Sequence, residues 1–237
     1  MSMKRNYFVF DGKSSAEFNA YIATSKAFDG AEHDEEVVEI PGRNGALVFS
    51  NGRYKNFVAE VACYIPHNMQ TNVDGFRAFL SSKYGYYRYE EAIKPGEFRL
   101  ARFIGPFSLS ASDRVGAAFT LSFDMKPQRF LKSGEIPVTY SAAGILYNST
   151  LFDAKPLIRC YGRSGTVTIN GTAVAVTGLS SYVDLDCDLM ESYEGATSRN
   201  STTTLTNGRF PTLAHGENAV SFSGFSSVVI TPRWWTL

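Results

Sequence analysis

Two stretches of alternating residues decide the fold of this chain: Phe57–Ile65, with the sequence FVAEVACYI, and Ala117–Met125, with the sequence AAFTLSFDM. In both stretches every second residue is apolar, and polar residues such as Glu60 and Asp124 stand between them. Side chains of a β-strand point alternately to opposite faces, so this spacing is typical of a strand with one buried face. The two stretches are therefore predicted to be long strands that supply much of one hydrophobic core.

Only one segment of the sequence predicts a helix, near residues 72–84. Its apolar residues recur at spacings of three and four, which places them on one side of a helix; they are Val73, Phe76, Phe79, Leu80 and Tyr84. Asn72 is a candidate cap and Gly85 a candidate stop. A single helix packed against sheet is expected in the first half of the chain.

Turns are predicted where Asn-Gly pairs and glycine-rich motifs separate apolar runs, because Asn and Gly tolerate the positive φ of a tight hairpin turn. Asn51-Gly52 and Asn170-Gly171 are both predicted to be hairpin turns, and the motif Gly42–Gly45 is predicted to be a hairpin tip. After Pro156 the chain consists of short strand-like runs separated by Gly, Asn and Ser. That spacing favours a β-sandwich.

The periodic pattern breaks between Arg129 and Asn148. We therefore expect an amino-terminal domain at residues 1–133, a linker at 134–147 and a carboxy-terminal domain at 148–237. The predicted fold class is mainly β, with an amino-terminal β-sandwich that carries one α-helix and a β-sandwich at the carboxy terminus.

Composition narrows the function classes. The 237 residues include 23 Lys and Arg and 23 Asp and Glu, whereas proteins that bind nucleic acids tightly carry a basic excess. No apolar run approaches the roughly 20 residues that span a bilayer, and no signal peptide is recognisable, so membrane insertion and export are not expected. Cys63, Cys160 and Cys187 are widely spaced, which favours buried, reduced thiols over disulfides or a zinc site.

No motif predicts catalysis, a cofactor or a metal ion. The histidines do not have HExxH spacing, no serine occupies a GxSxG motif, and glycine-rich phosphate loops are absent. His33–Glu36 is expected to be a solvated acidic loop, because consecutive side chains cannot converge on one ion. Asp184, Asp186 and Asp188 are expected on a polar strand face, since the glycine and terminal glutamate of a calcium-binding loop are missing.

The adjacent Trp234 and Trp235 leave two interpretations open. Flat aromatic rings stack on sugars or bases, so either ring is a candidate for ligand stacking. Packing in the core or at a subunit interface is the alternative, and neighbouring residues of a strand face opposite sides. At most one of the two rings is expected on any single surface.

A succession of short motifs keeps its order along nearly the whole chain: Ile40–Gly45, Gly52–Tyr54, Phe123–Phe130, Ala154–Ile158, Tyr161-Gly162, Asn170-Gly171, Tyr182 with Asp184 and Asp186, Phe210-Pro211, Gly216–Asn218 and Pro232–Trp234. In this succession the chain resembles the distal tail protein (Dit) family of long-tailed bacteriophages. The resemblance implies an amino-terminal ring-forming sandwich and a galectin-like carboxy-terminal sandwich. It also implies a structural protein of the virion rather than an enzyme.

The resemblance further implies a role as the hub of the tail tip or baseplate. Six copies would form a ring that joins the tail tube protein to tail-tip and receptor-binding proteins and leaves a channel for DNA, in a virion assembled from protein made in the host cytoplasm. A cyclic ring needs two different complementary surfaces on each subunit. Arg43, Asn44, Arg53 and Tyr54, in the family-like motifs near predicted turns, are the interface candidates.

A carbohydrate-binding module of a phage or cell-surface assembly is the alternative function. Sugar-binding galectins place His, Asn, Arg, Trp and Glu in a definite order, and the carboxy-terminal half of this chain has no such set. The galectin-like fold therefore does not by itself imply lectin activity.

Overall fold

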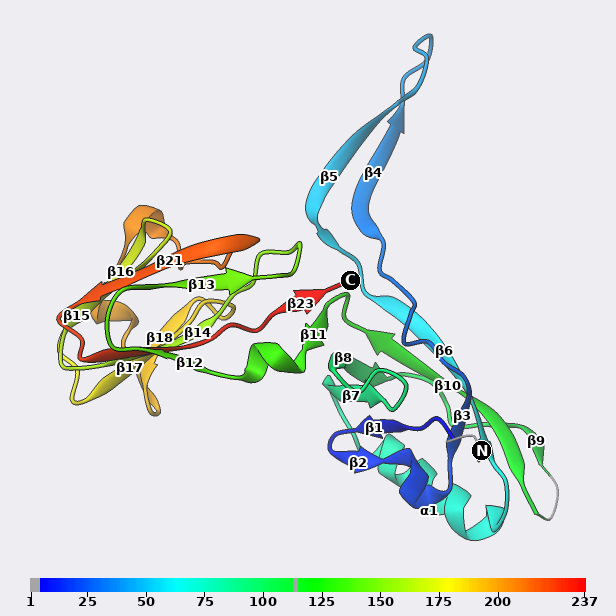
Figure 1. Ribbon diagram of the computed structural model, residues 1–237. Coiled ribbons are helices and arrows are strands. Elements are labelled where there is room, and N and C mark those ends of the chain that lie inside the picture. Colours follow the sequence, from blue (N-terminus) through cyan, green and yellow to red (C-terminus); the bar gives the residue numbers. More distant parts are fainter. Residues whose placement is uncertain (1–4, 113–114) are drawn as a thin grey trace. The chain divides into compact units, whose positions relative to one another are not determined.

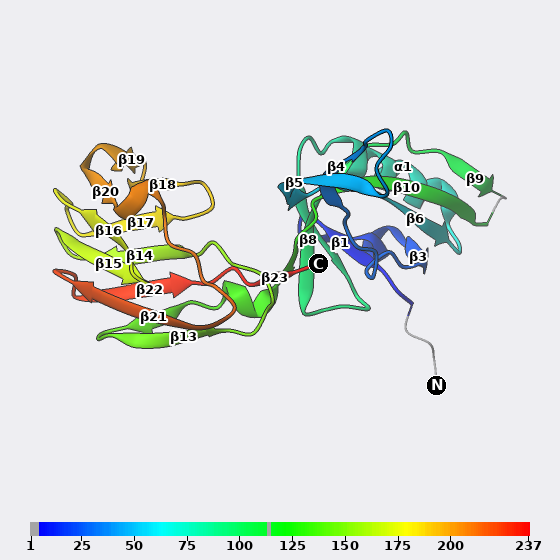
Figure 2. The ribbon, with the colours of Figure 1, turned by 90° about the horizontal axis from the view of Figure 1, so that it is seen from above.

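The computed structural model describes residues 5–112 and 115–237 and divides the chain into two compact units. The first unit ends at Arg129 and also includes Leu237, and the second is Phe130–Thr236. Both are built mainly from antiparallel strands, and one α-helix lies in the first unit (Figures 1 and 2). The predicted fold class, a mainly β protein with β-sandwiches and one α-helix, is confirmed.

The first unit contains the following elements: β1 (Phe8–Phe10), β2 (Lys13–Ser14), η1 (Ser15–Phe18), β3 (Tyr21–Thr24), β4 (His33–Glu39), β5 (Ala46–Tyr54), β6 (Phe57–Ile65), α1 (Met69–Ser81), β7 (Tyr87–Glu91), β8 (Glu97–Phe103), β9 (Leu109–Ser112) and β10 (Ala117–Met125). Seven strands form one sheet in the order β2-β1-β7-β8-β10-β6-β3, and β9 also pairs with β10. β4 and β5 form a separate two-stranded sheet.

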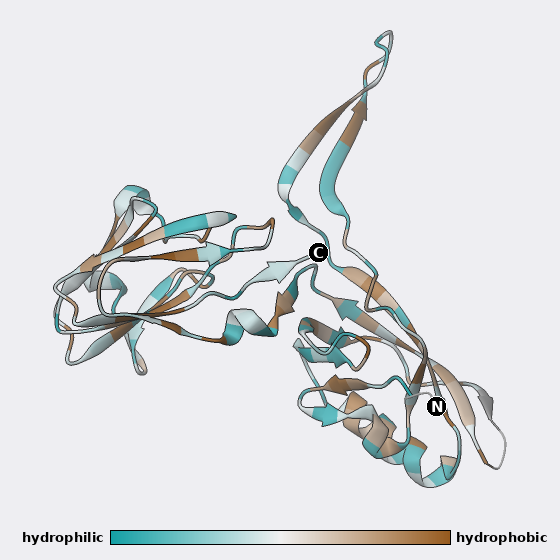
Figure 3. Ribbon diagram, viewed as in Figure 1, coloured by the Kyte–Doolittle hydropathy of each residue, from teal (hydrophilic) through white to brown (hydrophobic). Residues whose placement is uncertain are grey.

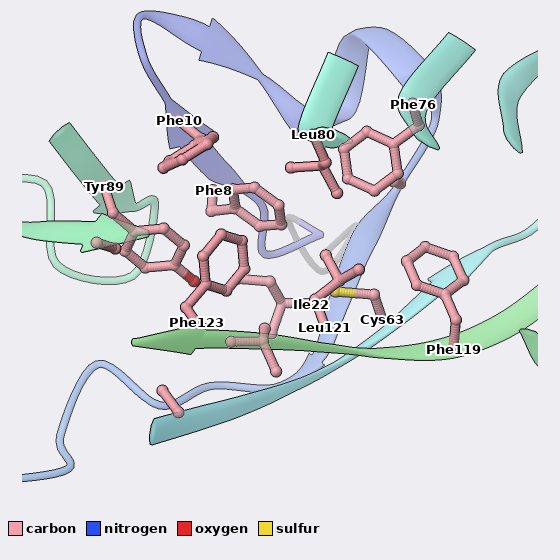
Figure 4. Packing of buried hydrophobic residues seen from close by; sticks show 14 of the residues in the cluster. Phe8, Phe10, Ile22, Cys63, Phe76, Leu80, Tyr89, Phe119, Leu121 and Phe123 are labelled. Carbon is pink, nitrogen blue, oxygen red and sulfur yellow. The ribbon is translucent and has the colours of Figure 1, made fainter. Parts of the chain in front are cut away.

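The predicted long strands are β6 and β10, and they pair antiparallel along their whole length, from Phe57 opposite Met125 to Ile65 opposite Ala117. Because directly opposed residues share a face, the alternating apolar residues of both strands reach the same core. Leu121 and Phe123 are fully buried there, and the Phe8 ring of β1 contacts Phe123 edge-on at a centroid distance of 5.7 Å (Figure 4).

The helix α1 covers this core with four of the five residues that the spacing predicted; the fifth, Tyr84, lies beyond the end of the helix and is 86% exposed. Val73, Phe76 and Leu80 are buried, as expected for one apolar side of a helix. The helix begins at Met69, before the expected start, so the predicted cap Asn72 lies inside the first turn. The side-chain amide of Asn72 donates a hydrogen bond to the Asn68 carbonyl at 3.0 Å.

The second unit contains the following elements: β11 (Arg129–Leu131), which begins at the last residue of the first unit, η2 (Lys132–Glu135), β12 (Val138–Tyr140), β13 (Gly144–Asn148), β14 (Leu157–Tyr161), β15 (Gly165–Ile169), β16 (Thr172–Val176), β17 (Tyr182–Asp186), β18 (Glu191–Glu194), β19 (Thr197–Ser198), η3 (Asn200–Thr202), β20 (Thr203–Leu205), η4 (Thr206–Gly208), β21 (Gly216–Ser223), β22 (Ser227–Thr231) and β23 (Trp235–Thr236).

Two antiparallel sheets make this unit a sandwich, with strand orders β12-β22-β14-β17-β18-β19 and β13-β21-β15-β16-β20. Their inner faces share a second core, in which Ile158, Val167 and Leu185 are fully buried. The predicted hairpin at Asn170-Gly171 is confirmed. Ile169 pairs with Thr172, and both turn residues have positive φ, as a two-residue hairpin requires.

The structure divides the chain differently from the expected domain boundaries. The stretch expected as a linker, 134–147, holds β12 and most of β13. These strands pair with β22 and β21, near the end of the chain, and belong to the second unit. The paired residues lie between 68 and 92 positions apart in the sequence, so no local pattern predicts the pairing.

Two local predictions in the first unit are wrong. Asn51-Gly52 does not form a turn but lies within β5, where the pairing with β4 shifts between His33 and Glu35. Gly52, at φ +66°, supplies the left-handed conformation that such a bulge needs. His33–Glu36 is not a loop but the start of β4, and the hairpin turn lies at Gly42–Gly45, as the other glycine motif predicted.

Within the part of the chain that the structure describes, no helix is long and apolar enough to cross a membrane. The helix α1 has 13 residues.

Candidate subunit interface

A hairpin formed by β4 and β5 projects away from the other strands of the first unit (Figure 1). We call β4, β5 and the turn between them the arm (residues 33–54). Glu39 pairs with Ala46 next to the turn, and His33 pairs with Tyr54 at the other end. All of residues 31–56 are described, and none of them is buried. The arm therefore has no place in the hydrophobic core of its own unit.

Apolar side chains are nevertheless concentrated on the arm. Val37 is 63% exposed, Val48 58% and Phe49 57%, and hydrophobic residues appear on both strands (Figure 3). An isolated two-stranded hairpin is at best marginally stable in water. Exposed apolar patches with polar rims mark interaction sites. The arm thus has the properties of an element that is completed by contact with another molecule.

The four interface candidates from the sequence all lie on the arm, but at its two ends. Arg43 and Asn44 are exposed in the turn, where the Arg43 N–H donates to the Ile40 carbonyl at 3.1 Å. Arg53 and Tyr54 lie at the end of β5, roughly 30 Å along the strand from the turn. A single small contact cannot include all four, whereas a partner that lies along the arm can.

Arg53 has a definite role within the arm. Its Nε donates to Asp34 Oδ2 at 2.6 Å, which ties β5 to β4 across the bulge. This hydrogen bond holds the pKa of Asp34 below its ordinary value. Tyr54 packs its ring against His33, with centroids 4.6 Å apart. Arg53 and Tyr54 therefore hold the base of the arm together, besides being accessible to a partner.

The sequence did not single out the exposed apolar residues of the arm, Val37, Val48 and Phe49. Valine and phenylalanine favour strands, and in the sequence they look like ordinary core residues. The available signal was the setting of Val37, which stands between glutamates on its own strand, Glu35 and Glu39. Apolar residues in so acidic a strand are poor candidates for a core.

The structure overturns the ligand-stacking interpretation of Trp234. Its side chain is only 8% exposed and belongs to the second core. Trp235 stacks on Phe152, with centroids 4.4 Å apart, and its Nε1 donates to the Asp153 carbonyl at 2.9 Å. The backbone also passes close to Gly134 here, since a Cβ at Gly134 would stand 2.2 Å from the Trp234 backbone nitrogen.

The remaining chemical candidates are occupied by structural contacts. Asp184 accepts two hydrogen bonds from Arg159, at 2.7 and 2.8 Å, and Asp186 accepts two from Arg233, at 2.8 Å each. The expected polar strand face is therefore a row of ion pairs on β17. Among the described residues no group of His, Cys, Asp or Glu is placed to hold a metal ion.

The three cysteines are buried and free, as expected from the sequence. Burial, followed by the charge of Glu91, raises the pKa of Cys63 to about 12. Burial likewise raises the pKa of Cys187 to about 12. The thiolate is the reactive form of cysteine, so these thiols have little reactivity in the folded protein.

Comparison with solved structures identifies the architecture. The Dit protein of phage SPP1 superposes on this chain with a TM-score of 0.78 at 13% sequence identity, and the match covers 99% of this chain and 100% of that one. The fold of this chain is that of SPP1 Dit. From its crystal structure, SPP1 Dit is described as a paradigm of the hub adsorption apparatus in phages that infect Gram-positive bacteria.

No family model matches the sequence, and no curated protein matches it. The likeness to Dit therefore rests on the arrangement of strands, over both units, rather than on residue identity. The ordered motifs of the sequence implied the same fold. The structural match covers 99% of the chain.

Proposed function

We propose that this chain is a structural component of a phage tail tip, the hub around which the tip or baseplate assembles. Six copies form a ring that joins the tail tube protein to tail-tip and receptor-binding proteins and leaves a channel for DNA. The protein is made in the host cytoplasm and carried in the virion. The Dit fold over the whole chain supports this assignment.

The arm is the single observation that carries the proposal. A hairpin with no buried residue and with exposed Val37, Val48 and Phe49 is stabilised when a neighbouring subunit covers it. In this proposal the first unit forms the ring, and Arg43, Asn44, Arg53 and Tyr54 contact the neighbouring subunit. A balanced charge of 23 basic and 23 acidic residues suits a channel that lets DNA pass without holding it.

Light scattering at several protein concentrations, followed by negative-stain imaging, tests the ring. We expect a mass of six times 26.1 kDa and a ring with a central hole. Arg43→Glu and Arg53→Glu should shift the mass toward smaller species without lowering the thermal midpoint of the monomer by more than about 3 °C. Unchanged mass in both variants would remove these two residues from the interface.

If the wild-type protein stays monomeric at every concentration, it does not form a ring by itself. In that case the same measurement is repeated with the adjoining tail tube protein, because a partner that binds only the assembled ring shifts the equilibrium toward it. Absence of a ring in that mixture as well would contradict the proposal.

Carbohydrate binding by the second unit is the other candidate, favoured by one surface of the sandwich. Tyr161 is 38% exposed on β14, and its ring centroid lies 6.4 Å from that of Tyr182 on β17. The Arg159 guanidinium lies 4.7 Å from the Tyr182 centroid. Aromatic faces beside charged hydrogen-bonding groups are suited to sugar rings. A glycan array with wild-type and Tyr161→Ala protein tests this, and absence of wild-type binding would reject it.

A further inference from the structure

A second exposed surface of the first unit carries positive charge, whereas strand β4 of the arm carries several glutamates. We call it the Lys94 patch, consisting of Lys26, Phe28, Ile93 and Lys94. Phe28 is 65% exposed and Ile93 52%, and the Lys94 ammonium lies 4.4 Å from the centre of the Phe28 ring, which brings the two segments together. The patch therefore combines two exposed apolar side chains with two cations.

The two lysines already have partners, but weak ones. Lys26 lies 3.3 Å from Asp29 and Lys94 lies 3.4 Å from Glu97, each pair three residues apart along the chain. Ion pairs of this local, solvent-accessible kind contribute little to stability, so a lysine can exchange its partner at small cost.

The patch borders a cavity of about 30 Å³ that both lysines line together with Arg99 and Arg129. The Nε of Arg129 is buried and has no hydrogen-bond partner among the described residues. Buried donors are rarely left unsatisfied. Arg129 also lies 3.5 Å from Glu97, so Glu97 is shared between Arg129 and Lys94.

One face of the arm complements this patch in charge and also carries exposed apolar side chains. Val37 and Val48 are paired across the strands, and Glu35 and Glu39 flank Val37 on the same face because strand side chains alternate. Neither glutamate has an ion-pair partner within residues 5–112 and 115–237. The face is thus two apolar side chains between two anions.

We propose that this face of the arm of one copy docks on the Lys94 patch of the neighbouring copy. The inference rests on the proposed ring and names the two surfaces that each subunit brings to it. Val37 and Val48 cover Phe28 and Ile93, while the flanking glutamates meet the lysines. In the single chain both surfaces are exposed, so the contact is between copies.

A docking of unlike surfaces is what a cyclic ring requires, since each subunit presents its arm to one neighbour and its patch to the other. Opposite charges around the two apolar pairs fix the register of the contact and repel a second arm or a second patch. The contact should therefore weaken as salt is added.

Cross-linking between two single variants tests the docking directly. Full-length Val37→Cys protein is mixed with Ile93→Cys protein and treated with a short bifunctional maleimide, to which the buried native thiols are inaccessible. We expect a heterodimer at several times the level given by Val37→Cys with Ile104→Cys, a matched control in which the exposed isoleucine lies on another loop and is 41% exposed.

Charge exchange supplies the second half of the test. Lys94→Glu added to the Ile93→Cys protein, or Glu39→Lys added to the Val37→Cys protein, should reduce the heterodimer by about threefold or more, and the two together should restore it. All these positions are accessible to solvent, and circular dichroism confirms that each variant is folded.

The outcomes separate the docking from the ring. A heterodimer no more abundant than the control, or no restoration by the double exchange, overturns the docking even if light scattering finds a hexamer. Specific cross-linking in a protein that never reaches six copies supports the docking and counts against the hexamer.

Discussion

Asp186 shows how a single carboxylate in the second unit is held. The residue is 3% exposed, and both of its oxygens accept hydrogen bonds from Arg233 at 2.8 Å. Burial alone would raise its pKa, but the hydrogen bonds from Arg233 and from the Leu189 and Asp188 backbone outweigh that effect. The pKa of Asp186 therefore lies below its ordinary value of 3.8.

This lowered pKa leads to a prediction for Asp186→Asn. Near neutral pH the variant should lose about 2 kcal/mol of unfolding free energy, less than for a fully enclosed pair because the Arg233 side chain is 31% exposed. A carboxyl with a depressed folded pKa contributes stability above its unfolded pKa and loses it as the pH falls through the folded one. The gap between wild type and variant should therefore close below pH 3.8.

Urea unfolding at a series of pH values measures this gap. Asp188→Asn is the matched control, because the Asp188 side chain is 60% exposed and pairs only at the surface with Lys155. It should change the unfolding free energy by less than about 0.5 kcal/mol. A gap for Asp186→Asn that stays constant with pH would show that the ion pair is not its cause.

Among the elements, β10 and the arm differ in how far their apolar side chains are buried. Every second residue of β10 is buried against β1, β6 and α1, so its pattern is explained within one unit. The arm has strand-forming residues as well, but none of its residues is fully buried. In the ring proposed above, a neighbouring copy supplies that burial.

The alternation of β10 predicts a large difference between neighbouring substitutions. Leu121 is fully buried, whereas Thr120 on the opposite face is exposed. Leu121→Ala should lower the unfolding free energy by about 3 kcal/mol, from lost apolar burial and the cavity that remains. Thr120→Ala should change it by less than about 0.5 kcal/mol. Urea unfolding compares the two, and equal losses would refute the assignment of the faces.

For the whole molecule, the important feature is the presence of two hydrophobic cores without a common residue. Each unit thus has a separate set of buried residues, which favours units that unfold cooperatively by themselves. The match to SPP1 Dit covers 99% of the chain and therefore includes both units.

Differential scanning calorimetry should accordingly resolve two transitions. Leu121→Ala should lower the midpoint of one transition and Asp186→Asn the midpoint of the other, because the substitutions lie in different units. A single transition that both substitutions shift by the same amount would mean that the two units unfold together.

The sequence by itself determined the long strands β6 and β10, the apolar side of α1, the hairpin at Asn170-Gly171 and the buried thiols. Periods of two and 3.6 residues and the φ preferences of Asn and Gly are local properties, so they can be recognised without knowledge of the partner segment. The ordered motifs also indicated the fold that SPP1 Dit shares.

Only the tertiary structure decided what depends on distant pairing. Asn51-Gly52 is a bulge rather than a turn because β5 continues along β4, and the expected linker forms strands because β22 and β21 return beside it. Trp234 is buried in a core whose other members, such as Ile158 and Leu185, come from distant strands. Strand pairing joins segments that are remote in sequence, so a local pattern can propose a strand but cannot say what covers it.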